Sequence, residues 1–315
     1  MRHRLYGQSI IWSQDLHPDL MDELFEQADF LKIHPRNKTL EGIDVAQLFF
    51  EESTRTRFSF ETSVHHLGGE NISTENARLS SSVAKGESLE DTVRTVAGYA
   101  QGIVLRHPDG DAAMKARDFL QTLDVWVPII NAGCGRSKGQ HPTQSMLDLY
   151  TIKAEVGRTE NLRVAMVGDP KRGRTVRSLA YLLGKYPGNH IDFVSPWQLA
   201  VENDILAYLR RHQVTFTQGE NLDDVIDKAD VVYMTRVQSE EPLEDGSMLD
   251  VDTSSYRLTT ERMKRLQKHA RVLHPLPKKS EIDPVISRFP QAAYFRQSDN
   301  GVPVRKALLE MVLGE

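Results

Sequence analysis

The stretch FFEESTRTR, residues 49–57, decides the fold, because an apolar strand runs here directly into a turn that starts a helix. We expect the strand over residues 45–50 and the helix over residues 54–67, whose apolar side chains recur at helical spacing. Gly68 and Gly69 supply a stop signal at the end of this helix. A strand followed at once by an amphipathic helix is the repeating unit of an α/β protein.

The turn itself is rich in groups that bind anions. Ser53, Thr54 and Thr56 offer hydroxyl donors, and Arg55 adds a forked guanidinium. The backbone N–H groups at the helix start, together with the positive end of the helix dipole, also favour a phosphate. An ordinary helix cap with solvated arginines explains the same residues, so this segment alone leaves both interpretations open.

Short apolar runs alternate with segments of helical period along the rest of the chain. We therefore predict an α/β fold with two doubly wound domains, each a parallel β-sheet flanked by helices. The first domain should span residues 1–150 and the second 151–295, and a C-terminal helix at about 296–315 should return to the first. The other expected segments are strands at 102–105, 125–130, 162–167, 191–194 and 231–234, and helices at 89–100, 141–152, 174–185 and 203–212.

The composition argues against several classes of function. The chain has 39% hydrophobic and 26% charged residues, and no apolar run approaches the ~20 residues that span a bilayer, so we expect a cytoplasmic protein outside the membrane. Its net charge of -5 argues against a nucleic-acid partner. Cys134 is the only cysteine, which excludes an internal disulfide and any multi-cysteine metal site.

The stretch STRTR after an apolar strand, with SFE behind it, resembles the carbamoyl-phosphate loop of the aspartate and ornithine carbamoyltransferases. Six further motifs occur in that family's order and at similar spacing. They are Lys85-Gly86-Glu87, Arg106-His107-Pro108, His141-Pro142-Thr143-Gln144, Gly173-Arg174-Thr175, Arg236-Val237-Gln238 and His274-Pro275-Leu276-Pro277. Each motif is weak alone, but together they cover most of the chain, which is identified as a member of this family.

The resemblance implies how the phosphate of carbamoyl phosphate is bound. Ser53, Thr54, Arg55 and Thr56 would hold it, and Arg106, at the end of the expected strand 102–105, would add a second guanidinium. Taken without the motif, an arginine in this position is more often a surface residue.

The resemblance also implies how the carbamoyl group is activated. His141 would donate to the carbonyl oxygen and stabilise the oxyanion that develops as the amine adds. Gln144 would fix the carbamoyl amide, and the backbone around Pro275 and Leu276 would contact the carbamoyl group and the amine. The residues implied as catalytic are Arg55, Lys85, Arg106 and His141.

The second half of the chain resembles the aspartate branch of the family. Arg236-Val237-Gln238 and the uninterrupted His-Pro-Leu-Pro are typical of that branch, and arginines can bind the two carboxylates of aspartate in bidentate fashion. The implied reaction carbamoylates L-aspartate, an early step of pyrimidine biosynthesis, with no metal or organic cofactor. The residues implied to bind aspartate are Lys85, Arg174, Arg236 and Gln238.

The loop at residues 80–87 reads SSSVAKGE and is either a solvated surface loop or part of a shared site. The resemblance implies that Ser81 and Lys85 enter the active site of a neighbouring subunit, which makes a homotrimer the smallest complete assembly. The chain carries no regulatory domain of its own, so a regulatory subunit or a dihydroorotase partner would be a separate polypeptide.

Several residues depart from the family pattern. Glu240 and Glu241 follow Arg-Val-Gln where the aspartate branch usually has an arginine, and Lys278 or Lys279 would have to compensate. Glu52 adds an acidic group beside the phosphate loop. The remaining departures are Ala84, where some members carry lysine, and the long acidic segment 244–256.

Three rival interpretations remain. Residues 168–175 fit the Walker A spacing except that Arg174 stands where lysine is required and Pro170 removes a backbone donor, which argues against nucleotide hydrolysis. A non-catalytic scaffold with the same fold would tend to lose the phosphate and carbonyl ligands that are present here. A carbamoyltransferase with another amine acceptor would keep them.

Overall fold

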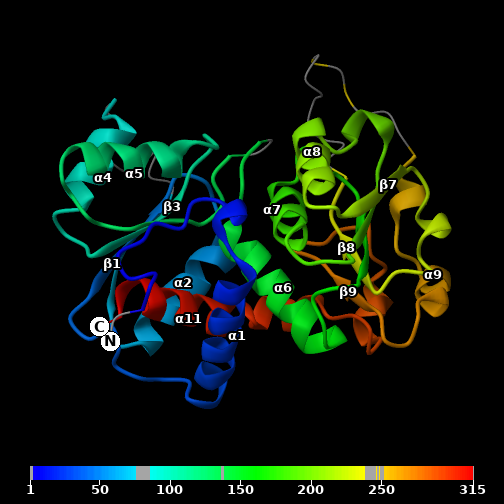
Figure 1. Ribbon diagram of the computed structural model, residues 1–315, viewed down its shortest axis with the longest axis horizontal. Coiled ribbons are helices and arrows are strands. Elements are labelled where there is room, and N and C mark those ends of the chain that lie inside the picture. The colour runs from blue at the N-terminus through cyan, green and yellow to red at the C-terminus, as the bar shows by residue number, and fades with distance from the viewer. Residues whose placement is uncertain are drawn as a thin grey trace. The chain divides into compact units, whose positions relative to one another are not determined.

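The computed structural model describes residues 3–75, 86–135, 138–237, 246, 248 and 252–314. It divides into two compact units, Met1–Leu147 with Asn300–Glu315, and Asp148–Asp299. Each unit contains one parallel β-sheet with helices around it, which confirms the predicted α/β fold (Figure 1). Helix α6 (Pro142–Val156) carries the chain from the first unit into the second.

The sheet of the first unit has four parallel strands in the order β2-β1-β3-β4. The chain therefore goes from the central β1 to one side and then crosses to the other, so β1 and β3 flank the point where the strand order reverses. The strands are β1 (Asp44–Phe49), β2 (Glu70–Glu75), β3 (Gly102–Arg106) and β4 (Ile129–Asn131).

The prediction of a strand from residue 125 was wrong in its first half, because β4 begins only at Ile129. Pro128 precedes it and has no N–H for a sheet hydrogen bond, although its carbonyl oxygen accepts from Ile103 N at 3.0 Å. Strand β2 was not predicted from the sequence. Its sequence is ENISTE, and it lies at the edge of the sheet. An edge strand can have polar side chains on an exposed face, so it lacks the continuous apolar run by which the other strands were predicted.

Helices surround this sheet. They are α1 (Pro18–Ile33), α2 (Thr54–His66), α4 (Leu89–Val96), α5 (Ala112–Thr122) and α11 (Gly301–Leu313). Ser88 caps α4, accepting from Asp91 N at 3.0 Å. The C-terminal helix α11 packs against α1 and α2 (Figure 1). Buried Lys306 of α11 donates to the carbonyl oxygens of Leu31 and Pro35 near the end of α1.

The sheet of the second unit has five parallel strands in the order β7-β6-β5-β8-β9. The strand order reverses between β5 and β8, as it does between β1 and β3 in the first sheet. The strands are β5 (Arg163–Val167), β6 (His190–Val194), β7 (Thr215–Gly219), β8 (Val231–Met234) and β9 (Arg271–Leu273).

The helices of the second unit include two that the sequence predicts, and these end one or two residues early. The α-helices are α7 (Arg174–Leu183), α8 (Asn203–Arg211), α9 (Thr260–Arg265) and α10 (Tyr294–Asp299). The 3-10 helices of the chain are η1 (Ser13–Asp15), η3 (Trp197–Leu199), η4 (Leu222–Asp224), η5 (Thr253–Tyr256) and η6 (Pro284–Arg288). Among the helices of the described residues, none is long and apolar enough to cross a membrane.

Candidate active site

The reversal of strand order in the first sheet brings two sequence motifs to one edge. Phe49 of β1 is in register with Arg106 of β3, and Phe50 N donates to Arg106 O at 2.8 Å. The turn that follows β1 and the side chain that ends β3 therefore start from neighbouring positions at the carboxyl edge of the sheet. This edge is where parallel α/β sheets bind ligands.

The turn after β1 opens directly into α2. Ser53 is the N-cap with an extended backbone (φ -163°), and within the described structure its side chain makes no capping hydrogen bond to the first turn. Thr54 and Arg55 are exposed, whereas Thr56 is buried. A first turn without a side-chain cap directs its N–H groups and the positive end of the helix dipole toward an incoming anion.

Arg55 adds a cation to this turn. Desolvation by the surrounding residues lowers the pKa of its guanidinium, which nevertheless stays protonated at neutral pH. No ion pair or hydrogen bond joins it to any other residue within the described ranges. Glu52, the acidic departure in the same turn, is exposed.

Arg106 is mostly buried, with 13% of its side chain exposed. Its Nη1 donates to Ala132 O at 3.4 Å, and its Nε lies 3.9 Å from Glu51 Oε2. The side chain therefore extends from β3 toward the loop after β4 and toward the turn after β1. Glu51 was not assigned a role from the sequence, because an acidic residue beside a phosphate loop gave no signal by itself.

His141 is buried and lies directly before α6. Its Nε2 lies 3.5 Å from Thr56 Oγ1, and its Nδ1 lies 3.3 Å from Thr143 Oγ1. The imidazole thus contacts the first turn of α2. His141 follows β4, whereas α2 follows β1. Thr56 and His141 are 85 residues apart in the sequence, and the fold brings them together as the sequence motifs suggest.

Arg106 and His141 both lie beside Gly133. A Cβ at Gly133 would lie 2.9 Å from Arg106 Nη1 and 2.9 Å from His141 Cδ2, and the residue has φ +105°. Neighbouring Asn131 shapes this turn, since its buried Oδ1 accepts from Gly133 N at 2.9 Å and from Cys134 N at 2.8 Å. Sequence reasoning missed both residues, although an Asn at the end of a strand with a Gly two residues later is a recognisable turn signal.

Gln144 lies in the first turn of α6, three residues after His141, and its backbone N donates to His141 O at 3.0 Å. It is half-buried. Residues three apart on a helix share a face, as the sequence motif predicts. The residues assigned to carbamoyl phosphate in the first unit thus lie at the start of α2, at the end of β3 and at the start of α6.

The second unit repeats this arrangement at the ends of β5 and β8. Arg174 is the first residue of α7 after the β5 loop, and Arg236 follows β8; both are half-buried. Thr235 joins the two loops, because its Oγ1 accepts from Asp169 N at 3.1 Å and donates to Val167 O at 2.8 Å. Sequence reasoning did not identify this threonine.

Buried Asp169 orders the loop that leads to Arg174. Its carboxylate accepts from Arg172 N at 2.9 Å and from Arg172 Nε at 2.8 Å, and its carbonyl oxygen accepts from Gly173 N at 3.0 Å. Gly168 lets the β5 and β8 loops approach, since a Cβ there would lie 2.2 Å from Thr235 O.

Pro275 and Leu276 follow β9 and are half-buried. Leu276 has φ +54°, a left-handed conformation that is uncommon for a branched side chain. Lys278, two residues on, has its Nζ 5.8 Å from the centre of the Tyr294 ring. The other predicted site residues, Ser81, Lys85 and Gln238, and the departures Ala84, Glu240 and Glu241 lie outside the described residues.

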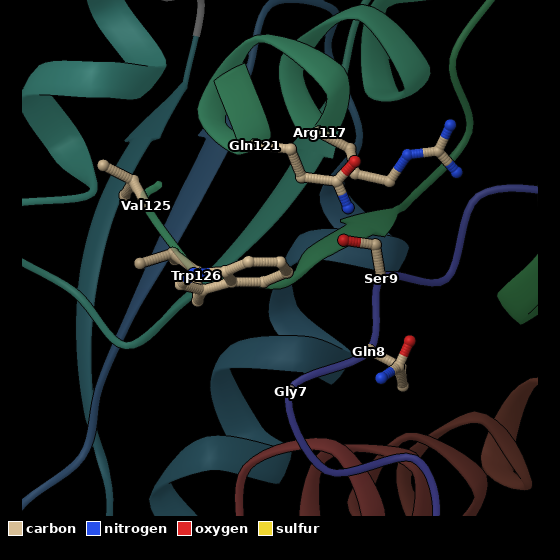
Figure 2. A pocket seen from close by; sticks show the side chains of 8 residues that line it. Gly7, Gln8, Ser9, Arg117, Gln121, Val125 and Trp126 are labelled. Carbon is tan, nitrogen blue, oxygen red and sulfur yellow. The ribbon is translucent and has the colours of Figure 1, made fainter. Parts of the chain in front are cut away.

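A pocket of about 340 Å³ in the first unit contains none of these residues (Figure 2). The N-terminal segment at Gly7, Gln8 and Ser9 forms one side of it. Arg117 and the exposed Trp126 contribute from α5 and the loop after it.

The fold and the first-unit site together define a two-unit α/β protein in which a turn rich in hydroxyl and guanidinium groups lies at the carboxyl edge of a parallel sheet. The sequence matches the family model of the aspartate/ornithine carbamoyltransferase carbamoyl-phosphate binding domain over residues 8–154. It matches the model of the family's Asp/Orn binding domain over residues 160–312. The chain belongs to the aspartate/ornithine carbamoyltransferase family, which confirms the family predicted from the motifs.

Named relatives and a solved structure support this family membership. The aspartate carbamoyltransferase catalytic subunit of Methanocaldococcus jannaschii is 44% identical over 295 residues, which cover 94% of this chain and 93% of the relative. The chloroplastic aspartate carbamoyltransferase 1 of Pisum sativum is 44% identical over 308 residues, 96% of this chain and 78% of the relative. The Trypanosoma cruzi aspartate transcarbamoylase in complex with carbamoyl phosphate superposes with a TM-score of 0.90 at 33% identity, covering 98% of each chain.

Proposed function

We propose that this chain is an aspartate carbamoyltransferase. It transfers the carbamoyl group of carbamoyl phosphate to L-aspartate, and it releases phosphate and N-carbamoyl-L-aspartate for pyrimidine biosynthesis. The observation that carries the proposal is the convergence of Thr56, Arg106 and His141 beside an uncapped helix start. The relatives named for this activity, at 40–44% identity, support aspartate as the acceptor.

The phosphate of the donor binds at the first turn of α2. Ser53, Thr54, Arg55 and Thr56 supply hydroxyl, guanidinium and backbone donors, and Arg106 adds a second guanidinium. The phosphate leaves as a dianion, so cations and oriented N–H groups that favour its charge also favour departure. Glu51 beside Arg106 limits the rotamers of that guanidinium and thereby aims it.

The carbonyl of carbamoyl phosphate becomes an oxyanion when the amine adds. His141 donates to that oxygen, Gln144 holds the carbamoyl amide, and Leu276 and Pro275 contact the group through their backbone. The aspartate nitrogen forms the new C–N bond, the C–O bond to phosphate breaks, and the proton that the nitrogen loses passes to the departing phosphate, which leaves as a dianion. A buried donor such as His141 acts strongly because little water competes with it.

Aspartate binds through Arg174, Arg236, Gln238 and Lys85 in this proposal. Arg174 and Arg236 are suited to the two carboxylates because a guanidinium binds a carboxylate through two parallel hydrogen bonds. The positions of these arginines after β5 and β8, at the reversal of the second sheet, support the assignment.

The direct experiment incubates the purified chain with labelled carbamoyl phosphate and either aspartate or ornithine. We expect labelled carbamoyl-aspartate and no carbamoyl-ornithine. Product with a different amine alone would favour a carbamoyltransferase with another acceptor. Absence of product with every amine, in a folded chain that still binds phosphate, would favour a non-catalytic scaffold.

We further propose a cytoplasmic homotrimer whose sites are shared between subunits through Ser81 and Lys85. Lys85→Ala and Arg55→Ala chains, each nearly inactive alone when both substrates are kept far below their KM values, should regain activity when their subunits are mixed, because some interfaces then receive both intact halves. Wild-type chains taken through the same exchange are the control. Activity that survives in the control but never returns in the mixture would mean that the loop acts within its own subunit.

The partners to test for in this assembly are a regulatory chain and a dihydroorotase. Size-exclusion chromatography with light scattering on the chain alone and with cell extract separates the trimer from larger assemblies. A mass equal to three chains in both samples would argue against such a partner.

A further inference from the structure

The His-Pro-Leu-Pro loop after β9 contains a histidine to which the proposed function assigns no role. We propose that His274 is a positioning residue, which as the tautomer protonated on Nε2 holds the backbone of Leu276 in its substrate-binding conformation. This inference rests on the proposed function, in which the Leu276 backbone contacts the carbamoyl group. His274 itself touches no substrate in this account.

The hydrogen bonds of the imidazole define its protonation. Leu276 N donates to His274 Nδ1 at 2.7 Å, so Nδ1 carries a lone pair and no hydrogen. The ring proton is therefore on Nε2, which donates to Glu281 Oε1 at 2.8 Å. A ring with a proton on Nδ1 could not accept from Leu276 and would leave that N–H without its partner.

Glu281 is arranged to accept the Nε2 proton. Burial raises the pKa of its carboxyl group, but hydrogen bonds from His274 and from the Lys279 backbone outweigh burial, and the net pKa lies below its ordinary value. Lys279 N lies 2.9 Å from Oε1 and 3.0 Å from Oε2. A carboxylate held in this way selects the Nε2-protonated ring and fixes its orientation.

The backbone of His274 is anchored from the opposite side. Its N–H donates to Gln297 Oε1 at 2.8 Å, and Gln297 Nε2 donates to Asp148 Oδ1 at 2.6 Å. Tyr233 donates its hydroxyl to the other oxygen of Asp148 at 2.7 Å. This buried chain joins α6, β8 and α10 to the start of the loop, so the histidine is fixed through both its backbone and its ring.

Leu276 needs such a constraint. Its φ of +54° is unfavourable for a leucine, and a conformation of this kind persists only when the surroundings determine it. The bond from Leu276 N to the ring two residues earlier is the observed constraint. With His274 in place, the carbonyl groups of Pro275 and Leu276 keep one direction before substrate arrives, which is preorganisation in the sense used for catalytic sites.

The same local bond occurs elsewhere in the chain and guides the choice of variants. His107 Nδ1 accepts from Asp109 N at 3.0 Å, and Asn131 Oδ1 accepts from Gly133 N at 2.9 Å. Asparagine can therefore replace histidine as the acceptor for an N–H two residues on. In His274→Asn the side-chain oxygen can still accept from Leu276 N, but the hydrogen bond to Glu281 is lost. In His274→Gln the longer side chain can still donate to Glu281, but the acceptor for Leu276 N is lost.

The test compares these two variants in the full-length chain. We expect His274→Gln to lower kcat about 10²-fold, the loss typical of a slightly misplaced reactive group, and His274→Asn to lower it less than tenfold. The inhibition constant of inorganic phosphate should change less than threefold in both variants, because phosphate binding does not use Leu276. Equal losses of kcat in the two variants would overturn the proposal.

Nitrogen-15 NMR of the histidine rings supplies a readout that does not depend on turnover. One ring signal should show protonated Nε2 and unprotonated Nδ1 and should disappear in His274→Asn. A signal from His274 with a protonated Nδ1 in an active chain would refute only the positioning role. A wild-type chain that shows the expected ring signal but forms no carbamoyl-aspartate would refute the proposed function and leave the structural bond intact.

Discussion

The two units differ in how their predicted site residues are distributed over the loops. In the first unit, one continuous turn after β1 contains most of the predicted phosphate donors, and Arg106 and His141 join it from β3 and from the start of α6. In the second unit, the predicted substrate residues lie singly on three loops, after β5, β8 and β9. Residues in one turn are positioned by the backbone of that turn. Residues on separate loops depend on other side chains that join the loops or fix their conformation.

Those supporting groups are visible in the second unit. Thr235 links the β5 and β8 loops, Asp169 orders the approach to Arg174, and His274 with Glu281 holds the β9 loop. The comparison therefore predicts that direct substitutions have their greatest effect in the first unit, and that substitutions behind the substrate residues matter more in the second.

The largest effect should follow removal of the buried donor in the first unit. We expect His141→Ala to lower kcat by ~10²-fold or more, the loss seen when one oxyanion donor is removed. Steady-state kinetics at saturating substrates measures it. His269→Ala, which removes a more exposed imidazole paired with Asp230, should change kcat less than about threefold. A His141→Ala chain with wild-type turnover would remove His141 from the chemistry.

A methyl group at Gly133 should disturb the same site without removing any donor. In Gly133→Ala the Cβ collides with both Arg106 and His141, so we expect kcat to fall by about tenfold to 10²-fold. Gly157→Ala is the matched control, because Gly157 also has positive φ (+85°) but no atom within 4 Å of the added Cβ. The account fails here if the two alanine variants lose the same stability and the same activity.

In the second unit, Thr235→Val should raise the KM for aspartate about tenfold, because the hydroxyl that joins the loops of Arg174 and Arg236 is lost. Unfolding by urea should also show a loss of ~1–3 kcal/mol, since Asp169 N loses a buried partner. Thr235→Ser keeps the hydroxyl and should restore both values. A KM for aspartate that stays at the wild-type value in Thr235→Val would show that the two loops are positioned independently.

The smallest effect concerns acid stability. The folded-state pKa of Glu281 lies below its ordinary value of 4.5, so its contribution to stability is present above that value and is lost as pH falls through the folded pKa. The difference in unfolding free energy between wild type and Glu281→Gln should therefore shrink as the pH falls from neutral through 4.5 and below. A difference that grows toward low pH would contradict the assigned direction.

Sequence reasoning predicted the α/β fold and the turn that begins α2, because both are encoded in short contiguous patterns. Helix α1 was missed, although Leu20, Leu24, Phe25 and Leu31 are buried at helical spacing, because its polar start concealed the stripe. Strand β7 was missed because it is a polar strand at the sheet edge.

Contacts between distant segments could not be read from the sequence at all. Gly133 is required by Arg106 and His141, and Thr235 by the β5 loop, and both requirements depend on residues that are distant in the sequence. His274 stood inside a recognised motif, but its role depends on Glu281 and Gln297, whose positions only the fold determines.

The central claim is that the first sheet binds the donor and the second binds the acceptor. Initial-rate kinetics with both substrates varied, on Arg55→Ala and Arg236→Ala, tests it most directly. We expect Arg55→Ala to raise the KM for carbamoyl phosphate by tenfold or more while Arg236→Ala raises the KM for aspartate by a similar factor, about the value of one charge-assisted bidentate pair. A rise in the KM for aspartate alone in Arg55→Ala, or for carbamoyl phosphate alone in Arg236→Ala, would contradict the account.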